Sequence, residues 1–159
     1  LRISDKAILC RNIIRSLKYL HDIGIVHRDI KCDNIICSTD IFEVRLIDFD
    51  VSCVKRDECI EDRVMGTPGN AAPELFNFEF RKNATMEDLK KVDFFALGCT
   101  LYEIYYNEYL FDTDPKLYVP PDLFNDDVDV PESVKILIMG LTKLNPEERF
   151  TWPDINGYY

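Results

Sequence analysis

Apolar residues recur at helical spacing near the start of the chain, over residues 4–23. They fall on one face of a helix with 3.6 residues per turn. These residues are Cys10, Ile13, Ile14, Leu17 and Leu20. Ser4 and Asp5 are candidate caps at the N-terminus, and Gly24 stands where a glycine commonly ends a helix. The pattern predicts an amphipathic helix.

Two short runs of β-forming residues follow, Ile35-Ile36-Cys37 and Val44-Arg45-Leu46-Ile47. The intervening sequence STDIFE is polar at most positions, so the two runs predict a small β-hairpin. Residues 48–85 carry turn signals such as Gly66-Thr67-Pro68-Gly69, and we expect loops there.

A second helix is predicted from about Leu89 to Tyr106. It is apolar on most faces, which is typical of a buried central helix. Residues 107–130 are rich in proline and aspartate and predict irregular structure. Pro131-Glu132 then begins a third helix, which we expect to end near Leu144. The predicted fold is mainly α with one small β-hairpin.

Composition narrows the class of protein. The chain has 159 residues, of which 47% are hydrophobic and 30% are charged, and this composition suits one globular domain with one core. No apolar run is long enough to cross a bilayer, so we expect no membrane association. The net charge of −10 argues against nucleic-acid binding, which needs a basic face. An acidic surface is compatible with basic protein substrates, although it can also serve solubility alone.

The six cysteines form no CxxC pair, and the only two histidines are close together in sequence, so a zinc site is not expected. Cys10 and Cys99 lie in apolar patterns and are predicted core residues. We expect reduced thiols and therefore an intracellular protein, either cytoplasmic or nuclear.

Three motifs follow one another along the chain. They are His27-Arg28-Asp29-Ile30-Lys31-Cys32-Asp33-Asn34, Asp48-Phe49-Asp50 and Ala72-Pro73-Glu74. In this order they resemble H-R-D-L-x-x-x-N, D-F-G and A-P-E of eukaryotic-type protein kinases. Gly66-Thr67-Pro68, residues 93–98 and residues 144–149 extend the resemblance over almost the whole chain.

The resemblance implies the C-terminal, larger lobe of a serine/threonine protein kinase over residues 1–159, with a catalytic loop at 27–34 and an activation segment at 48–74. Such a kinase transfers the γ-phosphoryl group of ATP to a serine or threonine hydroxyl of a protein, with Mg²⁺. By resemblance, Asp29 would accept or orient the proton of that hydroxyl, and Lys31 would stabilise charge on the phosphoryl group. Thr67 would hydrogen-bond both side chains.

The resemblance also implies a nucleotide site and a metal site. Asn34 is the fourth predicted catalytic residue, and with Asp48 it would hold Mg²⁺ through oxygen atoms. Asn34, Asp48 and Lys31 would also face the nucleotide. Ile36 matches the apolar residue beneath the adenine ring; the alternative is that Ile36 belongs to the core of the hairpin.

Other positions carry structural or regulatory roles in the family. By resemblance, His27 would pack beneath the activation segment, and Asp93 would anchor the backbone of the catalytic loop. Glu74 and Arg149 would form a buried ion pair. Arg28 belongs to the subgroup whose arginine meets a phosphorylated residue of the activation segment.

The sequence departs from the family pattern in several places. No G-x-G-x-x-G motif occurs, and no segment before the first helix carries the nucleotide-binding lysine. We therefore expect a C-terminal lobe whose N-terminal lobe is absent, through truncation of the sequence (the favoured explanation), through loss, or because another chain supplies it. The second hypothesis for function is a kinase-like module without catalysis, which binds a small lobe or a regulatory partner.

Single residues also differ from the family. Asp50 stands where the family has glycine, which tolerates backbone angles that aspartate avoids. Asn70 replaces a frequent tyrosine of the substrate-binding wall, and about seven extra residues within 76–91 predict a longer loop before the central helix.

Residues 54–65 contain no serine, threonine or tyrosine, although they contain four acidic residues. We hypothesise that Glu61 or Asp62 pairs with Arg28 without phosphorylation; the alternative is a solvated acidic loop. Arg28→Glu should then lower activity, and Glu61→Lys with Asp62→Lys in the same chain should restore it. A phosphotransfer assay of the single, double and triple variants tests this, and no recovery in the triple variant would rule out the pairing.

Overall fold

The computed structural model describes residues 1–38, 43–55, 66–111 and 128–159. Its helices are α1 (Ile3–Asp22), α2 (Phe78–Asn83), α3 (Met86–Tyr106), α4 (Glu132–Leu141) and α5 (Trp152–Ile155). Two 3-10 helices, η1 (Cys32–Asn34) and η3 (Pro73–Phe76), and the strands β1 (Ile35–Cys37) and β2 (Val44–Leu46) complete the described elements. The predicted fold class, mainly α with a small hairpin, is confirmed.

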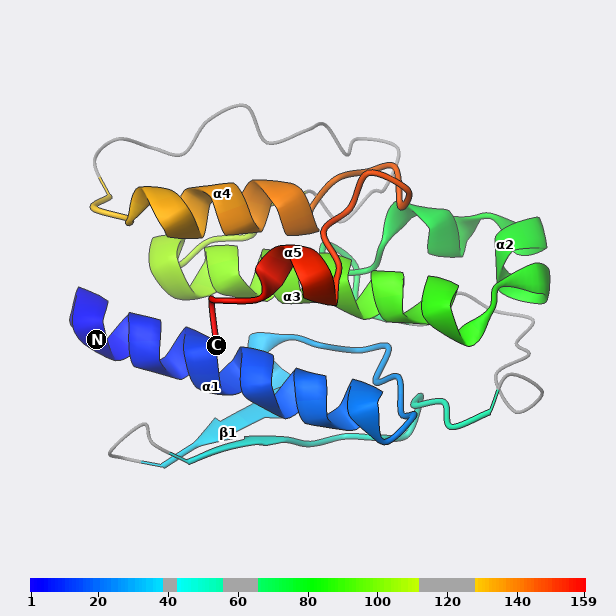
Figure 1. The fold of residues 1–159 in the computed structure, drawn as a ribbon, viewed down its shortest axis with the longest axis horizontal. Helices are drawn as coiled ribbons and strands as arrows, with labels where there is room; N and C mark the ends of the chain where they lie inside the picture. The colour runs from blue at the N-terminus through cyan, green and yellow to red at the C-terminus, as the bar shows by residue number, and fades with distance from the viewer. Residues whose placement is uncertain (39–42, 56–65, 112–127) are drawn as a thin grey trace.

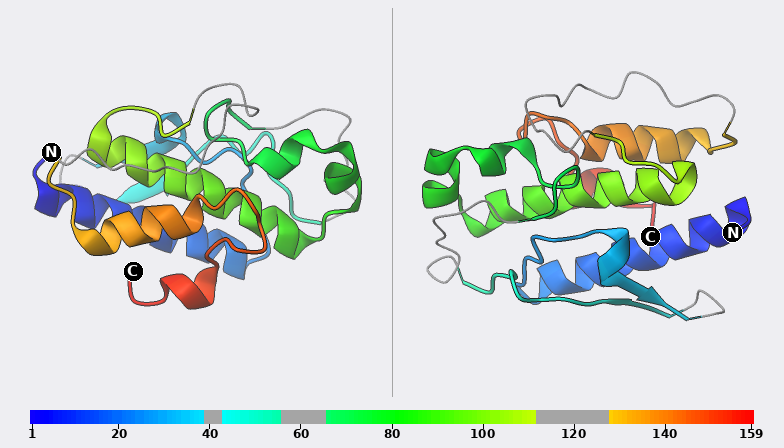
Figure 2. Two further views of the ribbon diagram at one scale, coloured as in Figure 1. Left: turned by 90° about the horizontal axis from the view of Figure 1, so that it is seen from above. Right: turned by 180° about the vertical axis from the view of Figure 1, so that it is seen from behind.

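The elements are stacked in layers around α3 (Figure 1). Helix α4 packs on one side of α3 and α1 on the other, and α1 also contacts β2. The view from behind shows the same order, with the sheet beyond α1 (Figure 2). Helix α3 is consequently buried along most of its length, as its apolar sequence predicts.

Helix α1 begins and ends within one residue of its predicted bounds. Asp5 contributes to the first turn from inside the helix, where its carboxylate accepts the backbone N–H of Arg2, whereas Ser4 is not a cap. At the other end Gly24 takes φ +82°. Its N–H donates to the carbonyl of His21 at 3.2 Å, and the N–H of Ile25 donates to Leu20 at 2.9 Å. This is the Schellman arrangement, which needs a left-handed residue at the position of Gly24.

The core lies where α1, α3 and α4 meet. Its fully buried side chains include Ile13, Ile14, Leu17, Leu97, Leu101, Ile138 and Leu141. Helices α3 and α4 approach closely at Gly98, where an added Cβ would lie 2.6 Å from Cγ2 of Thr142. Cys10 and Cys99 are buried, which confirms them as core residues.

The hairpin pairs Ile35 with Leu46 and Cys37 with Val44 in antiparallel register, and its connection at 39–42 lies outside the described residues. Ile36 is 53% exposed. The interpretation of Ile36 as hairpin core is therefore wrong, because in this register its side chain points to the open face of the sheet.

Short helices account for most differences from the prediction. Helix α2 lies within a region expected to be loop, and Asn77 caps it by accepting the N–H of Glu79 at 2.9 Å. Helix α3 begins three residues before Leu89, because Thr85 and Asp88 form a capping box. Helix α4 ends at Leu141 rather than Leu144, and α5 was not predicted. Part of the expected irregular region, residues 112–127, lies outside the described residues.

The cysteines correct one expectation. Cys53 is disulfide-bonded, whereas Cys10, Cys32, Cys37 and Cys99 are free. The expectation of reduced thiols is wrong at Cys53, because a disulfide depends on proximity in space, which sequence spacing does not reveal. Among the described helices, none combines the length and the apolar character needed to cross a bilayer.

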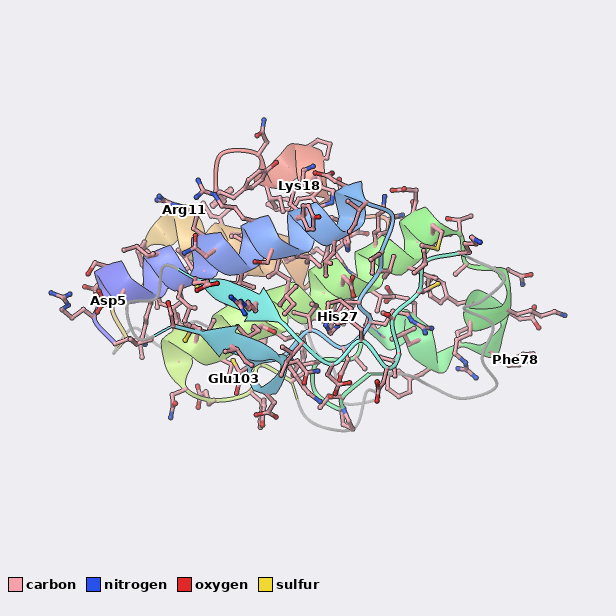
Figure 3. The ribbon with its side chains drawn as sticks, turned by 90° about the horizontal axis from the view of Figure 1, so that it is seen from below. Asp5, Arg11, Lys18, His27, Phe78 and Glu103 are labelled. Carbon is pink, nitrogen blue, oxygen red and sulfur yellow. The ribbon has the colours of Figure 1, made fainter. Side chains whose placement is uncertain are left out.

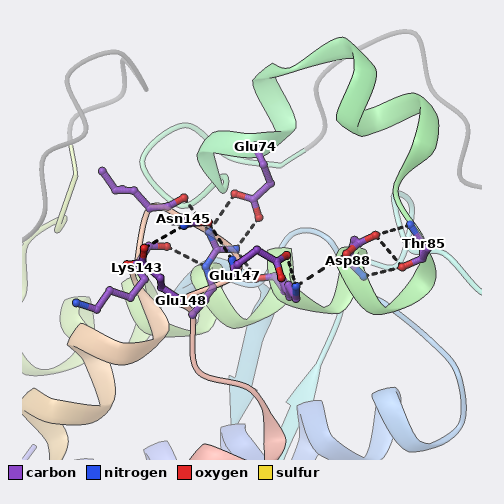
Figure 4. A network of polar contacts seen from close by, with 10 residues as sticks. Glu74, Thr85, Asp88, Lys143, Asn145, Glu147 and Glu148 are labelled. Atoms are coloured by element: carbon purple, nitrogen blue, oxygen red, sulfur yellow. Dashed lines mark hydrogen bonds and ion pairs between the residues drawn. The ribbon is translucent and has the colours of Figure 1, made fainter.

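A buried ion pair ties the segment before α2 to the segment before α5. Arg149 donates from Nη1 and Nη2 to the two carboxylate oxygens of Glu74, at 2.6 and 3.0 Å. Its remaining N–H groups donate to the carbonyls of Lys91, Lys143 and Leu144 at 2.7, 3.0 and 3.5 Å. Figure 4 shows Glu74 and Lys143 converging on this network. The guanidinium also lies 5.0 Å from the centre of the Phe95 ring.

We expect Arg149→Met to lower the free energy of unfolding by about 3–5 kcal/mol, because it leaves the Glu74 carboxylate buried without its partner. The arginine side chain is 0% exposed and the glutamate side chain 7%. Arg45→Met is the control, because it breaks an exposed pair with Glu43 and should cost less than about 1 kcal/mol. Urea unfolding measures both, and equal losses would contradict the buried role.

Candidate active site

Asp93 on α3 holds the backbone of the predicted catalytic loop. Its fully buried carboxylate accepts the N–H of His27 at 2.8 Å and the N–H of Arg28 at 2.7 Å. Arg28 takes φ +67°, a left-handed conformation that non-glycine residues adopt rarely. The two hydrogen bonds offset the energetic cost of this conformation. They also fix the backbone just before the next residue, Asp29.

Asp29, Lys31 and Thr67 form a closed triangle. Lys31 Nζ lies 2.9 Å from Oδ2 of Asp29 and donates to Oγ1 of Thr67 at 2.7 Å. The hydroxyl of Thr67 donates to Oδ1 of Asp29 at 2.7 Å. Gly66 allows this approach, because at φ +101° it lies so near the loop that an added Cβ would be 3.3 Å from the carbonyl oxygen of Arg28. The structure thus brings three of the four predicted catalytic side chains together.

The triangle controls the charge of Asp29. Burial alone would raise the pKa of this carboxyl, but hydrogen bonds from Thr67 and Lys31 and the charge of Lys31 outweigh burial and hold the pKa below its ordinary value. Asp29 is therefore a carboxylate at neutral pH, able to accept a hydrogen bond or a proton from a hydroxyl group.

Asn34 and Asp48 are the two residues that the sequence predicts as metal ligands. The Nδ2 atom of buried Asn34 donates to the carbonyl and to Oδ2 of Asp29, at 2.9 and 3.0 Å, which leaves Oδ1 for another partner. The N–H of Ile47 donates to the carbonyl of Asn34 at 3.0 Å, so Asp48 follows directly beside this residue. Asp48 is exposed and forms no hydrogen bond or ion pair with another described residue.

This donor set fits Mg²⁺, which commonly takes one or two protein oxygens and completes its octahedron with phosphate and water. Within the described residues, no group of three or more histidine, cysteine, aspartate or glutamate side chains forms a site that could hold a metal by itself. Asp48 takes φ +63°, whereas Asp50 does not have a positive φ. The backbone angle that we expected to strain Asp50 therefore occurs two residues earlier.

His27 is fully buried, and both of its ring nitrogens are engaged. Nε2 lies 3.0 Å from the carbonyl of Ile47, and Nδ1 accepts the N–H of Asp29 at 3.3 Å. The ring packs 4.9 Å from the ring of Phe49. Figure 3 labels His27 in the loop that follows α1. These contacts favour the structural role that the sequence assigns to His27.

Arg28 links the catalytic loop to the segment after β2. Its Nε donates to the carbonyl of Val51 at 2.5 Å, and next to it Val26 and Cys53 exchange backbone hydrogen bonds at 2.9 and 2.8 Å. Glu61 and Asp62 lie outside the described residues, so their pairing with Arg28 stays a prediction.

Two further residues contribute to the site. Asn70, which we associated with the substrate wall, is buried instead and lies 3.5 Å from the carbonyl of Ile30. His21 was missed; its Nε2 lies 2.9 Å from Oδ2 of Asp93. A signal existed, because His21 continues the series Ile14 and Leu17 on the buried face of the first helix.

Comparisons with known proteins agree with these observations. Residues 3–158 match the family model of the protein kinase domain. The chain is 31% identical over 172 residues to the serine/threonine-protein kinase GG21441 of Drosophila erecta, covering 98% of this chain and 22% of that protein. It is 34% identical over 149 residues to the meiosis-specific serine/threonine-protein kinase mek1 of Schizosaccharomyces pombe, covering 87% of this chain and 33% of mek1. It is also 34% identical over 162 residues to the mitogen-activated protein kinase kinase kinase 1 of Arabidopsis thaliana, covering 95% of this chain and 25% of the relative.

We expect Thr67→Val to raise the pKa of Asp29, because it removes the hydroxyl that donates to the charged form. Thr85→Val is a matched control, since Thr85 donates to Asp88 at 2.7 Å and that hydrogen bond helps to lower the pKa of Asp88. Titration of the carboxyl ¹³C signals should show each substitution moving only its own aspartate upward. A pKa of Asp29 that is the same in Thr67→Val and wild type would contradict the triangle.

Proposed function

Since the chain belongs to the protein kinase family, we propose that it is the C-terminal lobe of an intracellular serine/threonine kinase. In this proposal it transfers the γ-phosphoryl group of ATP to a serine or threonine hydroxyl of a protein. The observation that carries the proposal is the triangle of Asp29, Lys31 and Thr67, in which a carboxylate and a cation are held side by side.

Each of the three residues of the triangle has its own role in the proposed reaction. The ionised carboxylate of Asp29 orients the substrate hydroxyl and takes its proton as the hydroxyl oxygen bonds to the γ-phosphorus. The bond from that phosphorus to the bridging oxygen of ADP breaks. Lys31 offsets negative charge on the transferred group. Thr67 holds both side chains in place, because its hydroxyl accepts a hydrogen bond from Lys31 and donates one to Asp29.

Oδ1 of Asn34 and the carboxylate of Asp48 would hold Mg²⁺, and Lys31, Asn34, Asp48 and Ile36 would face ATP. When bound, Mg²⁺ supplies positive charge that neutralises the phosphate oxygens. The exposed side chain of Ile36, which has no place in the core, supports a contact with the flat apolar surface of a nucleotide base.

A groove next to Phe49 supports the proposal that this chain is one of the two lobes of a kinase. It has a volume of about 460 Å³ and is lined by side chains of α1 and β2 together with Phe49. Tyr19 and Phe49 in this groove are 64% and 41% exposed. A second lobe that carries the Gly-rich loop and the nucleotide lysine would cover this apolar face. The chain spans between 22% and 33% of the length of the relatives described above, which accords with a part of a larger kinase.

A second candidate is a kinase-like module that binds a partner without phosphotransfer. The exposed groove favours it, and so does Asp50 in place of glycine. In both candidates the natural substrate or partner faces an acidic molecule of net charge −10, which favours basic residues on the protein that it binds.

We expect Asp29→Asn to lower the kcat of phosphotransfer by about 10²–10⁴-fold, because the amide cannot take the proton. The assay follows γ-phosphate transfer from Mg-ATP to basic peptides that contain serine, threonine or tyrosine, in the full-length protein and in residues 1–159 alone. Asp22→Asn is the control, since Asp22 is an exposed partner of Lys18 on α1. Residues 1–159 alone should transfer little or no phosphate, because part of the phosphate clamp belongs to the other lobe.

The outcomes separate the two candidates. Activity in the full-length protein that survives Asp29→Asn would refute the role of Asp29. A full-length protein that transfers no phosphate, with or without the substitution, would leave the partner-binding module as the better description.

A further inference from the structure

The one tryptophan of the chain is hydrogen-bonded to one of its two histidines. Nε1 of Trp152, at the start of α5, donates to Nδ1 of His21, near the end of α1, at 3.1 Å. The two residues are 131 positions apart in sequence. Helix α5 therefore lies over the seam between α1 and α3 (Figure 1), and its tryptophan reaches a nearly fully buried histidine.

This hydrogen bond determines where the imidazole carries its proton. An indole N–H can only donate, so Nδ1 of His21 must be the acceptor. The proton of the neutral ring then sits on Nε2, which lies 2.9 Å from Oδ2 of Asp93. His21 in this tautomer donates to Asp93.

Asp93 is thus satisfied from two sides. Oδ2 accepts from His21 and from the N–H of His27, and Oδ1 accepts the N–H of Arg28 at 2.7 Å. Three hydrogen bonds in series run from Trp152 through His21 and Asp93 to the backbone that precedes Asp29. The carboxylate cannot rotate toward the loop or away from it without breaking its bond to His21.

The aromatic surroundings hold the series in place. The ring of His21 lies edge-on to Phe94 and to Trp152, with centroids 5.5 and 5.4 Å away, and Phe94 packs 4.9 Å from Trp152. The carboxylate of Asp154 accepts the N–H of Thr151 at 2.9 Å and so fixes the first turn of α5.

We propose that Trp152 is a positioning residue for the catalytic loop: by holding His21 in the Nε2–H form, it keeps Asp93 oriented toward the amides of His27 and Arg28. No atom of Trp152 needs to touch substrate or nucleotide. The effect on the rate of phosphotransfer rests on the proposed function, whereas the hydrogen-bond series itself does not.

Nuclear magnetic resonance on the ¹⁵N-labelled chain tests the first bond directly. With one tryptophan and two histidines, the ring signals are few enough to assign. We expect a scalar coupling across the hydrogen bond between Nε1 of Trp152 and Nδ1 of His21, with the His21 proton on Nε2. A His21 ring that carries its proton on Nδ1 would overturn the proposal.

Amide exchange tests the positioning. Trp152→Phe keeps a ring against Phe94 but removes the donor, so exchange at the amides of His27 and Arg28 should accelerate about five-fold, the effect of one hydrogen bond. The amide of Val26 is the internal reference, because it donates to Cys53 and not to Asp93, and its exchange should not change. Equal acceleration of all three amides in Trp152→Phe, or acceleration of none, would overturn the proposal.

Phe94→Leu is the matched control for packing. It loosens the same cluster but leaves the indole N–H in place, so the coupling should remain and the three amides should change together. In the full-length protein Trp152→Phe should lower kcat about five-fold with less than about a two-fold change in KM for ATP. Selective exchange at His27 and Arg28 in a protein without kinase activity would refute the proposed function and leave the positioning role intact.

Discussion

Asp93 carries a carboxylate into the middle of the molecule, where no water reaches it. A buried charge is costly unless several donors surround it, and here two of the donors are the backbone amides of His27 and Arg28. The loop that contains His27 and Arg28 makes these two hydrogen bonds with Arg28 in a left-handed conformation at φ +67°. The central helix α3, which is buried along most of its length, supplies this carboxylate. The position of Asp29 consequently depends on the core rather than on the loop's own preferences.

The sequence predicts those parts of the fold whose signals are local. The apolar face of α1 and the glycine at 24 placed that helix to within a residue, because helical periodicity and a left-handed C-terminal residue act over a few positions. Helices α2 and α5 are only six and four residues long, too short for periodicity to be visible. What stabilises them is a cap, at Asn77 and Thr151, together with packing that the sequence does not display.

The residues of the site likewise include some that the sequence predicts and some that it does not. Motif resemblance named Asp29, Lys31, Asn34 and Thr67, and the structure brings all four within one network. It could not name Trp152, because the contact with His21 closes a loop of 131 residues and belongs to no motif. Nor could it show that Ile36 faces outward, since a one-residue change of register would bury it.

The charge on Asp29 is set by the side chains that lie beside it. Thr67 and Lys31 keep this carboxyl ionised although it is half-buried, and both donors come from the described residues of this chain. Donors that are already oriented need not reorganise when charge develops during a reaction, which is where enzymes gain most. Asp48, in contrast, is exposed and has no partner among the described residues, so its position is the less constrained of the two. The fold therefore orients the donors around Asp29 in advance, whereas the described residues leave the carboxylate of Asp48 open to a further partner.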